Sequence, residues 1–267
     1  MELVNKKYRI IEKIGEGNFG IIYKGENIRT RELVAVKVEP IEKELKLLKN
    51  ESIIYQYLNN LECTPNVKWF GKDEDNYYMV INLLGESLQS VKRDSKFSLT
   101  NVLEIGIQIV ILIKSIHDKG LVHRDIKPDN FLFGLNKQRN NIYIIDFGLC
   151  KPYITNEKHN PIKKTNNLIG SLSYASMNAH NLIELSRRDD MESLGYMLAF
   201  FYLGKLSWND LTVENMTMIP KLKENILINN SLPPILVNYI KYVRSLEYDE
   251  KPNYYLIIEE FKREIDI

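Results

Sequence analysis

Two polar clusters near the middle of the chain contain the residue types that chemistry at a metal-bound polyphosphate needs. The first is the run from His123 to Asn130, HRDIKPDN, and the second is Asp146 in the tripeptide Asp-Phe-Gly. Asp125 offers a carboxylate that can take the proton of a hydroxyl group, and Lys127 offers an ammonium that can stabilise charge on a moving phosphoryl group. Asn130 and Asp146 offer a neutral and a charged oxygen to a magnesium ion. These groups together predict phosphoryl transfer from a metal-bound nucleotide to an alcohol.

A glycine-rich turn near the amino terminus comprises Gly15, Glu16, Gly17, Asn18, Phe19 and Gly20. Its pattern is weak evidence alone, because dinucleotide-binding folds use the same spacing before a helix. Here the strand-like run IIYKG follows. This run argues against a nucleotide-dependent oxidoreductase and predicts a hairpin whose backbone amides lie over phosphate oxygens. An ordinary tight turn is the alternative.

Lys37 lies in the middle of the apolar run VAVKV. A lone lysine in such a run is usually at a sheet edge or extends its ammonium to solvent. The functional alternative is contact with the α- and β-phosphates, with a helix carboxylate holding the ammonium. Glu51 lies fourteen positions on (51 − 37) in a predicted helix, and Glu44 lies two turns earlier on the same face. Periodicity alone leaves both glutamates open.

The pattern along the chain predicts the α+β class. Alternation and β-branched residues predict strands at 8–14, 21–24, 33–38, 67–70 and 77–81. A helical repeat predicts a helix from residue 41 to about residue 59. The later part is mainly helical, with a helix expected from a cap at Thr100 through His117, ahead of Gly120. Short strands are expected around Leu132 and at 142–145.

The inferred architecture has two lobes. A small β-rich N-lobe is expected at 1–82, a hinge at 82–86 and a larger, mainly helical C-lobe at 86–267. The length of 267 residues suits one such domain.

Composition narrows the possible partners and compartments. The 36 basic and 35 acidic residues give a formal charge of +1, which gives no indication of nucleic-acid binding. Cys63 and Cys150 have no metal-like spacing, and the first residues lack the apolar core of a signal peptide. The most apolar segment, 105–116, is short for a bilayer and favours a buried helix. We therefore expect an intracellular protein, cytoplasmic or nuclear or both, that is monomeric and not inserted in a membrane.

Other polar residues are expected to support the site. Asp190, in the run RRDDMESLG, is expected to accept backbone amides of the catalytic loop from a helix, although a solvated surface acid is the alternative. His123 and Arg124 are expected to brace that loop. The remaining histidines lack metal-ligand spacing and are interpreted as structural or exposed: His117, His159 and His180.

These elements occur in the order that protein kinases use. Several longer runs are more specific: LLGESL at 83–88, KPDNFL at 127–132, IIDFGL at 144–149, YASMNAH at 174–180, SRRDDMESLGY at 186–196 and DEKP at 249–252. Through these runs the chain resembles the casein kinase one family over nearly its whole length. The YASMNAH stretch stands where most kinases carry Ala-Pro-Glu.

The resemblance implies a bilobal serine/threonine protein kinase that uses ATP and Mg²⁺ and acts on protein substrates. It selects Glu51 as the partner of Lys37, Ile81 as the gatekeeper beside the adenine and Leu84 as the source of hinge hydrogen bonds. It also implies that the base lies between Ile14, Ile22, Ala35, Leu132 and Ile145. A catalytically silent pseudokinase is the alternative, against which the intact residues Lys37, Asp125, Asn130 and Asp146 argue.

Two departures from the family bear on substrate choice. Members often favour acceptors downstream of phosphorylated or acidic residues, through a basic anion site. Ser173 and Ile219 stand where two basic residues of that site are expected, with Lys163 and Lys164 as partial replacements. One charge-assisted hydrogen bond contributes about 1.5–3 kcal/mol, so its loss corresponds to roughly ten- to a hundredfold in phosphate affinity. We expect weak dependence on such primed substrates.

Overall fold

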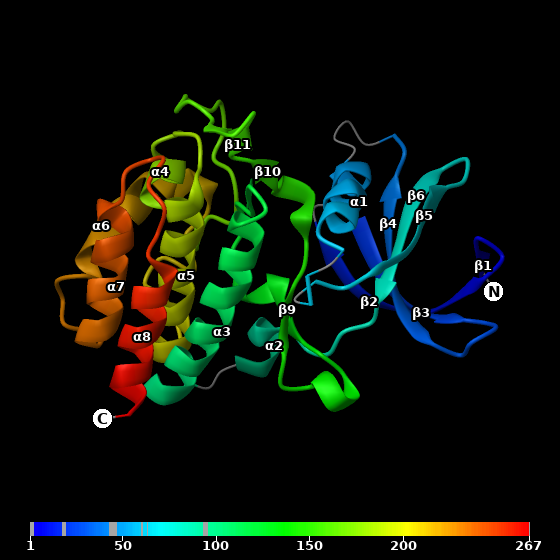
Figure 1. The fold of residues 1–267 in the computed structure, drawn as a ribbon, viewed down its shortest axis with the longest axis horizontal. Helices are drawn as coiled ribbons and strands as arrows, with labels where there is room; N and C mark the ends of the chain where they lie inside the picture. The colour runs from blue at the N-terminus through cyan, green and yellow to red at the C-terminus, as the bar shows by residue number, and fades with distance from the viewer. Residues whose placement is uncertain are drawn as a thin grey trace. The chain divides into compact units, whose positions relative to one another are not determined.

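A computed structural model describes residues 3–17, 20–42, 47–59, 61–62, 64–92 and 96–266 (Figure 1). Four residues discussed above lie outside these ranges: Asn18, Phe19, Glu44 and Cys63. The chain divides into an N-terminal unit, Met1–Glu86 with Phe131–Leu149, and a C-terminal unit, Ser87–Asn130 with Cys150–Ile267. The first is built mainly from strands and the second mainly from helices, which confirms the α+β class and the β-rich and helical parts.

A six-stranded antiparallel sheet forms the frame of the N-terminal unit. In spatial order its strands are β1 (Leu3–Val4), β2 (Tyr8–Gly17), β3 (Gly20–Asn27), β4 (Leu33–Pro40), β6 (Asn76–Asn82) and β5 (Val67–Lys72). The predicted strand after the glycine-rich turn is confirmed, because Gly17 pairs with Gly20 at the end of the β2–β3 hairpin. Gly20 has a φ of +137°, and a Cβ there would lie 2.1 Å from the carbonyl oxygen of Val38. Only glycine fits this approach of β3 to β4.

The two faces of the sheet have different roles. Side chains alternate between faces along a strand, so β4 directs Val34 and Val36 to one face and Ala35 and Lys37 to the other. Both valines are completely buried in a core cluster. The other buried members of that cluster are Val4, Tyr8, Tyr78 and Val80. The packed valine face therefore fixes the strand that carries Lys37.

Helix α1 (Leu47–Tyr57) lies beside β4 in the same unit (Figure 1). Its buried residues recur with the spacing of one helix face: Leu48, Glu51, Ser52 and Tyr55. The backbone amide of Leu48 donates to the Glu39 carboxylate of β4 at 3.1 Å, which satisfies an amide in the first turn of the helix. The predicted helix from 41 to about 59 is thus observed over 47–57, and residues 43–46 of that prediction lie outside the described ranges.

The second segment of the N-terminal unit is a short hairpin with two 3₁₀ turns. Its elements are β8 (Phe131–Phe133), η2 (Asn136–Gln138), β9 (Ile142–Ile144) and η3 (Phe147–Leu149). The amide of Gly85 donates to the Phe133 carbonyl at 2.7 Å, and the amide of Phe133 donates to the Glu86 carbonyl at 3.0 Å. These bonds attach the hairpin to the end of the first segment.

The C-terminal unit consists mainly of helices: α2 (Leu88–Lys92), α3 (Leu99–His117), α4 (Met177–His180), α5 (Arg187–Leu203), α6 (Ile219–Asn225), α7 (Pro234–Ser245) and α8 (Tyr254–Ile265). Short elements complete it: β7 (Leu121–Val122) paired with β10 (Lys151–Pro152), β11 (Ile154–Thr155) paired with β12 (Lys158–His159), η1 (Pro128–Asn130) and η4 (Val213–Met218). Helix α5 contacts α3 and α7, and α3 contacts α8 (Figure 1). Fourteen of the 17 residues of α5 are buried, which makes it the central helix.

Helix α3 ends at His117 as predicted, but its predicted cap is wrong. Ser98 caps the helix by accepting the amide of Asn101 at 3.2 Å, and Thr100 lies inside the first turn. The amide of Phe97 donates to the carbonyl of Phe201 on α5 at 3.1 Å, and this tertiary contact sets where the helix begins.

Helix α3 is also, within the described ranges, the one helix long and apolar enough to cross a membrane. Nine of its 19 residues are buried within this unit.

Candidate active site

Three charged groups of the N-terminal unit meet on the side of β4 that faces α1. The Lys37 ammonium lies 2.6 Å from the Glu51 carboxylate of α1 and 3.0 Å from Asp146, which follows β9. The side chains of Lys37 and Glu51 are 9% and 2% exposed, against 15% for Asp146. One buried cation therefore bridges two carboxylates drawn from two distant segments of the chain.

The pKa values of this cluster follow from burial and from its charge imbalance. Burial alone would lower the pKa of Lys37, but the charges of Glu51 and Asp146 outweigh burial and raise it above its ordinary value. Burial, assisted by the nearby Asp146 carboxylate, raises the pKa of Glu51 to about 7 in spite of Lys37. The Lys37 ammonium therefore stays protonated, and its single positive charge is shared between two carboxylates.

The backbone of Asp146 is held by a tyrosine of α1. Asp146 has a φ of +67°, a region that few residues other than glycine adopt. Its amide donates to the Tyr55 hydroxyl at 3.2 Å, and the Tyr55 ring packs edge-on against Phe147 with 4.9 Å between centroids. Tyr55 follows Glu51 by one helical turn, so one face of α1 positions both Lys37 and Asp146.

The predicted nucleotide residues of the sheet share the face of Lys37. Ile22 of β3 is directly opposite Lys37, and Ala35 of β4 is directly opposite Ile81 of β6. Ala35 is 8% exposed and Ile14 is 49% exposed. The face opposite the valine core therefore offers apolar groups beside an ammonium, as an aromatic base joined to phosphates requires.

The remaining predicted nucleotide residues are placed as follows. Gly15 pairs with Ile22, Gly17 pairs with Gly20, and Glu16 forms an ion pair with Lys13. Leu84, Leu132 and Ile145 are partly buried. Leu84 also lines a groove of about 680 Å³ formed by other parts of the N-terminal unit, among them Leu61 and Tyr143. Among the predicted site residues that the structure describes, Leu84 alone lines that groove.

The catalytic-loop residues cluster in the C-terminal unit around Asp125. This carboxylate is 4% exposed and accepts from the Lys127 ammonium at 2.7 Å. The amide nitrogen of Asn130 donates to the Asp125 backbone carbonyl at 2.8 Å, which commits the nitrogen and leaves the oxygen as the atom that Asn130 can offer to a cation. The Ser171 hydroxyl donates to the second oxygen of Asp125 at 2.7 Å. Asp125, Lys127 and Asn130 are thus brought together, with Ser171 as a further partner.

The buried Asp190 carboxylate of α5 binds the backbone of the loop that carries Asp125. Asp190 accepts the amides of His123 and Arg124 at 2.7 and 2.8 Å, as predicted. Its carboxylate also contacts the buried His117 ring at 2.9 Å. Burial would raise the pKa of Asp190, but these partners outweigh it and lower that pKa. Asp190 therefore stays charged and fixes two successive amides, which supports the positive φ of +69° at Arg124.

The segment that begins at Gly170 lies directly against the catalytic loop. Gly170 has a φ of +91°, and a Cβ there would lie 2.6 Å from the carbonyl oxygen of Arg124. Residues from both sides, among them Asp125 and Tyr174, enclose a cavity of only about 10 Å³. Such close packing makes the position of this segment depend on the loop that carries Asp125.

A comparison with protein families assigns residues 8–259 to the family described as "Protein kinase domain". The chain belongs to the protein kinase domain family. The kinase is therefore a phosphotransferase that uses ATP, generally with Mg²⁺, and acts on protein substrates. The order of its motifs and its α+β architecture agree with this assignment.

Sequence reasoning missed two residues that position the polar groups of the kinase. Tyr55 has no signal beyond the helical repeat, although its spacing of one turn from Glu51 places it on the same face. Ser171 had no local signal, because its partner Asp125 lies 46 positions away. Neither contact can be deduced from local periodicity.

Proposed function

We propose that the chain is an active serine/threonine kinase of the casein kinase one type, which transfers the γ-phosphoryl group of ATP to serine or threonine hydroxyls of proteins. The observation that carries this proposal is the environment of Asp125. Its two carboxylate oxygens are held by Lys127 and Ser171, so the carboxylate has a defined direction before a substrate arrives. A pseudokinase has no need of such an arrangement.

Asp125 would accept the proton of the attacking hydroxyl as that oxygen bonds to the γ-phosphorus and the bond to the leaving ADP oxygen breaks. Lys127, 2.7 Å from Asp125, would stabilise negative charge on the transferring group. Asn130 holds the loop closed through the Asp125 carbonyl. The three residues thus divide proton acceptance, charge stabilisation and loop geometry among them.

On the nucleotide side, Lys37 would bind the α- and β-phosphates. Glu51 and Asp146 orient its ammonium, and their combined charge keeps it protonated. The apolar face around Ala35 and Ile81 would accept the base. Each unit also offers an oxygen that would suit Mg²⁺, a hard cation that prefers carboxylate and carboxamide oxygens: Asp146 in the N-terminal unit and Asn130 in the C-terminal unit. When bound, Mg²⁺ neutralises phosphate charge.

We further propose that the kinase depends weakly on primed substrates. Ser173 carries no charge, and Ile219 is completely buried, so neither position supplies a cation. Lys163 lies 3.6 Å from Glu184, and Lys164 donates to a backbone carbonyl at 3.3 Å. A substrate phosphate would have to compete with these existing partners.

The catalytic proposal is tested with Asp125→Asn, which keeps the size of the side chain and removes the base. We expect phosphorylation of a casein-type peptide to fall by about 10²- to 10⁴-fold while nucleotide binding is retained. The product site is then located by mass spectrometry. Equal inactivity of wild type and variant, with both folded and binding nucleotide, would favour the pseudokinase.

The substrate proposal is tested with matched peptides that differ only in one upstream phosphoserine. We expect the kcat/KM values of the two peptides to lie within about tenfold of each other. A charge-assisted hydrogen bond to the phosphate would by itself raise kcat/KM for the primed peptide by that factor or more. A much larger preference for the primed peptide would contradict the proposal.

A further inference from the structure

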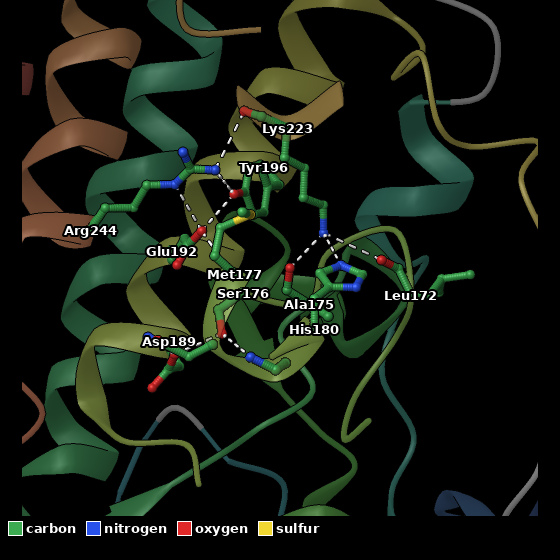
Figure 2. Close-up of polar contacts among 12 residues, drawn as sticks. Leu172, Ala175, Ser176, Met177, His180, Asp189, Glu192, Tyr196, Lys223 and Arg244 are labelled. Atoms are coloured by element: carbon green, nitrogen blue, oxygen red, sulfur yellow. Dashed lines mark hydrogen bonds and ion pairs between the residues drawn. The ribbon is translucent and has the colours of Figure 1, made fainter. Parts of the chain in front are cut away.

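A completely buried lysine of α6 connects to the segment that follows Ser171. Figure 2 shows the Lys223 ammonium directed at two backbone carbonyls and one imidazole. It donates to the Ala175 carbonyl at 2.5 Å and to the Leu172 carbonyl at 3.4 Å, and it lies 3.1 Å from Nε2 of His180. Two of its N–H groups are used by the carbonyls, and the third can donate to the imidazole when Nε2 carries no proton.

The surroundings of Lys223 make its burial costly. Burial lowers its pKa to about 7, with Glu192 opposing and Arg244 reinforcing the effect. Glu192 and Arg244 are themselves paired at 3.0 Å. The ammonium instead lies over the rings of Tyr196 and Trp208, 4.5 and 5.6 Å from their centroids. An apolar side chain of similar length would avoid this desolvation cost, so the hydrogen bonds to the segment are what the lysine specifically adds.

The segment that follows Ser171 also forms hydrogen bonds with several buried side chains. The Trp208 indole donates to the Ser173 carbonyl at 2.8 Å. Ser176 donates to Asp189 at 2.7 Å, and the amide of Met177 donates to Glu192 at 3.1 Å (Figure 2). Lys223 holds the carbonyls of Leu172 and Ala175, which lie on either side of Ser173. It therefore fixes the segment at two further points, in addition to the Trp208 contact with Ser173.

The amino-terminal end of this segment leads directly to the proposed base. Ser171 donates to Asp125, and the adjacent carbonyl held by Lys223 belongs to Leu172. The substrate residues on either side of an acceptor hydroxyl can contact the backbone that lies next to the catalytic base. A shift in the 172–175 backbone would change how a peptide lies relative to Asp125, while the nucleotide groups Lys37 and Asp146 belong to the other unit.

We propose that Lys223 is a positioning residue for the protein substrate: by holding the Leu172 and Ala175 carbonyls, it sets the backbone on which the residues flanking the acceptor rest. This inference rests on the proposed kinase activity. It assigns Lys223 to peptide recognition and separates it from nucleotide binding and from the phosphoryl-transfer step.

The test compares Lys223→Met with Lys92→Met. Methionine keeps the length of the side chain and removes all three donors. Lys92 is a matched control in the same unit, because it is 2% exposed, donates to the Gly204 carbonyl at 2.5 Å and lies over the Phe200 ring. Both changes remove a buried ammonium, but only Lys223 donates to the Leu172 and Ala175 carbonyls.

For Lys223→Met we expect the peptide KM to rise about tenfold, which corresponds to about 1.4 kcal/mol, with kcat within about threefold and the KM for ATP unchanged. Lys92→Met should leave all three values near those of wild type. Lys223→Arg, which keeps charged donors, should recover part of the peptide KM. Thermal unfolding of each variant establishes that the compared proteins are folded.

Identical peptide KM values for Lys223→Met and Lys92→Met would overturn the inference, as would equal rises in the KM for peptide and ATP. If Lys223→Met does not fold, Lys223→Arg and Lys223→Gln decide by the same split between peptide and ATP. A third outcome separates the two proposals: the wild type is active, Asp125→Asn abolishes that activity, and the Lys223 variants keep the wild-type peptide KM. The kinase proposal would then stand, and only the proposed role of Lys223 would be refuted.

Discussion

Replacing Glu51 by glutamine should change how stability depends on pH, because Glu51 is a buried carboxylate whose pKa is raised on folding. Its ordinary pKa of 4.5 rises to about 7 in the folded protein. Between these values the folded state binds a proton that the unfolded state has released, so wild-type stability falls as pH rises. The difference of 7 − 4.5 = 2.5 corresponds to about 3 kcal/mol. Glu51→Gln removes this contribution.

The charge count of the cluster predicts a contrast with a second variant. Lys37 contributes one positive charge, and Glu51 and Asp146 contribute two negative ones when both are ionised. Glu51→Gln leaves Lys37 paired with Asp146 at 3.0 Å, whereas Lys37→Met leaves two buried carboxylates facing each other. Removing one partner of a buried pair costs about 3–5 kcal/mol, so Lys37→Met should be far more destabilising than Glu51→Gln at neutral pH.

The measurement is the free energy of unfolding from urea titrations at several pH values between about 5 and about 8. The wild-type value minus that of Glu51→Gln should fall by about 3 kcal/mol over this range. Glu259→Gln is the control, because that side chain is 56% exposed in its pair with Lys262. Parallel curves for wild type and Glu51→Gln, or equal destabilisation by Glu51→Gln and Lys37→Met, would refute the reasoning.

Two further predictions concern other buried groups. Tyr55→Phe removes the acceptor of the Asp146 amide and keeps the ring contact with Phe147, so we expect a loss of about 1 kcal/mol in unfolding free energy and a several-fold rise in the KM for ATP. An unchanged KM would show that the hydroxyl does not position Asp146. Lys223 has a pKa lowered from 10.5 to about 7, so the unfolded state binds the extra proton between these values and stability should rise with pH there, by roughly 5 kcal/mol in total. Lys223→Met should flatten this rise in urea titrations, and a slope that persists in the variant would assign it to other groups.

The sequence predicted features that depend on neighbouring residues better than features that depend on distant ones. β-Branched residues placed β3 and β4 correctly, because the preference of such residues for strands acts locally, whatever the strand pairs with. The partner of Lys37 could not be chosen by periodicity, since the sequence spacing predicts Glu44 and Glu51 on the same face of a helix. The resemblance selected Glu51, and the Glu51 carboxylate lies 2.6 Å from the Lys37 ammonium. The cap of α3 was misplaced because Phe97, two residues before Leu99, is fixed by a contact to α5.

Two buried lysines, one in each unit, show why burial alone does not determine what a charged group does. Lys37 and Lys223 both lose the solvation of their ammonium groups, yet the pKa of Lys37 is raised and that of Lys223 is lowered. The acceptors account for this difference: Lys37 faces two carboxylates, whereas Lys223 faces two carbonyls and an imidazole. A group that must bind phosphate benefits from a charge that persists at every physiological pH. A group that holds backbone carbonyls needs N–H donors in a fixed direction, and these remain useful even as the charge is lost.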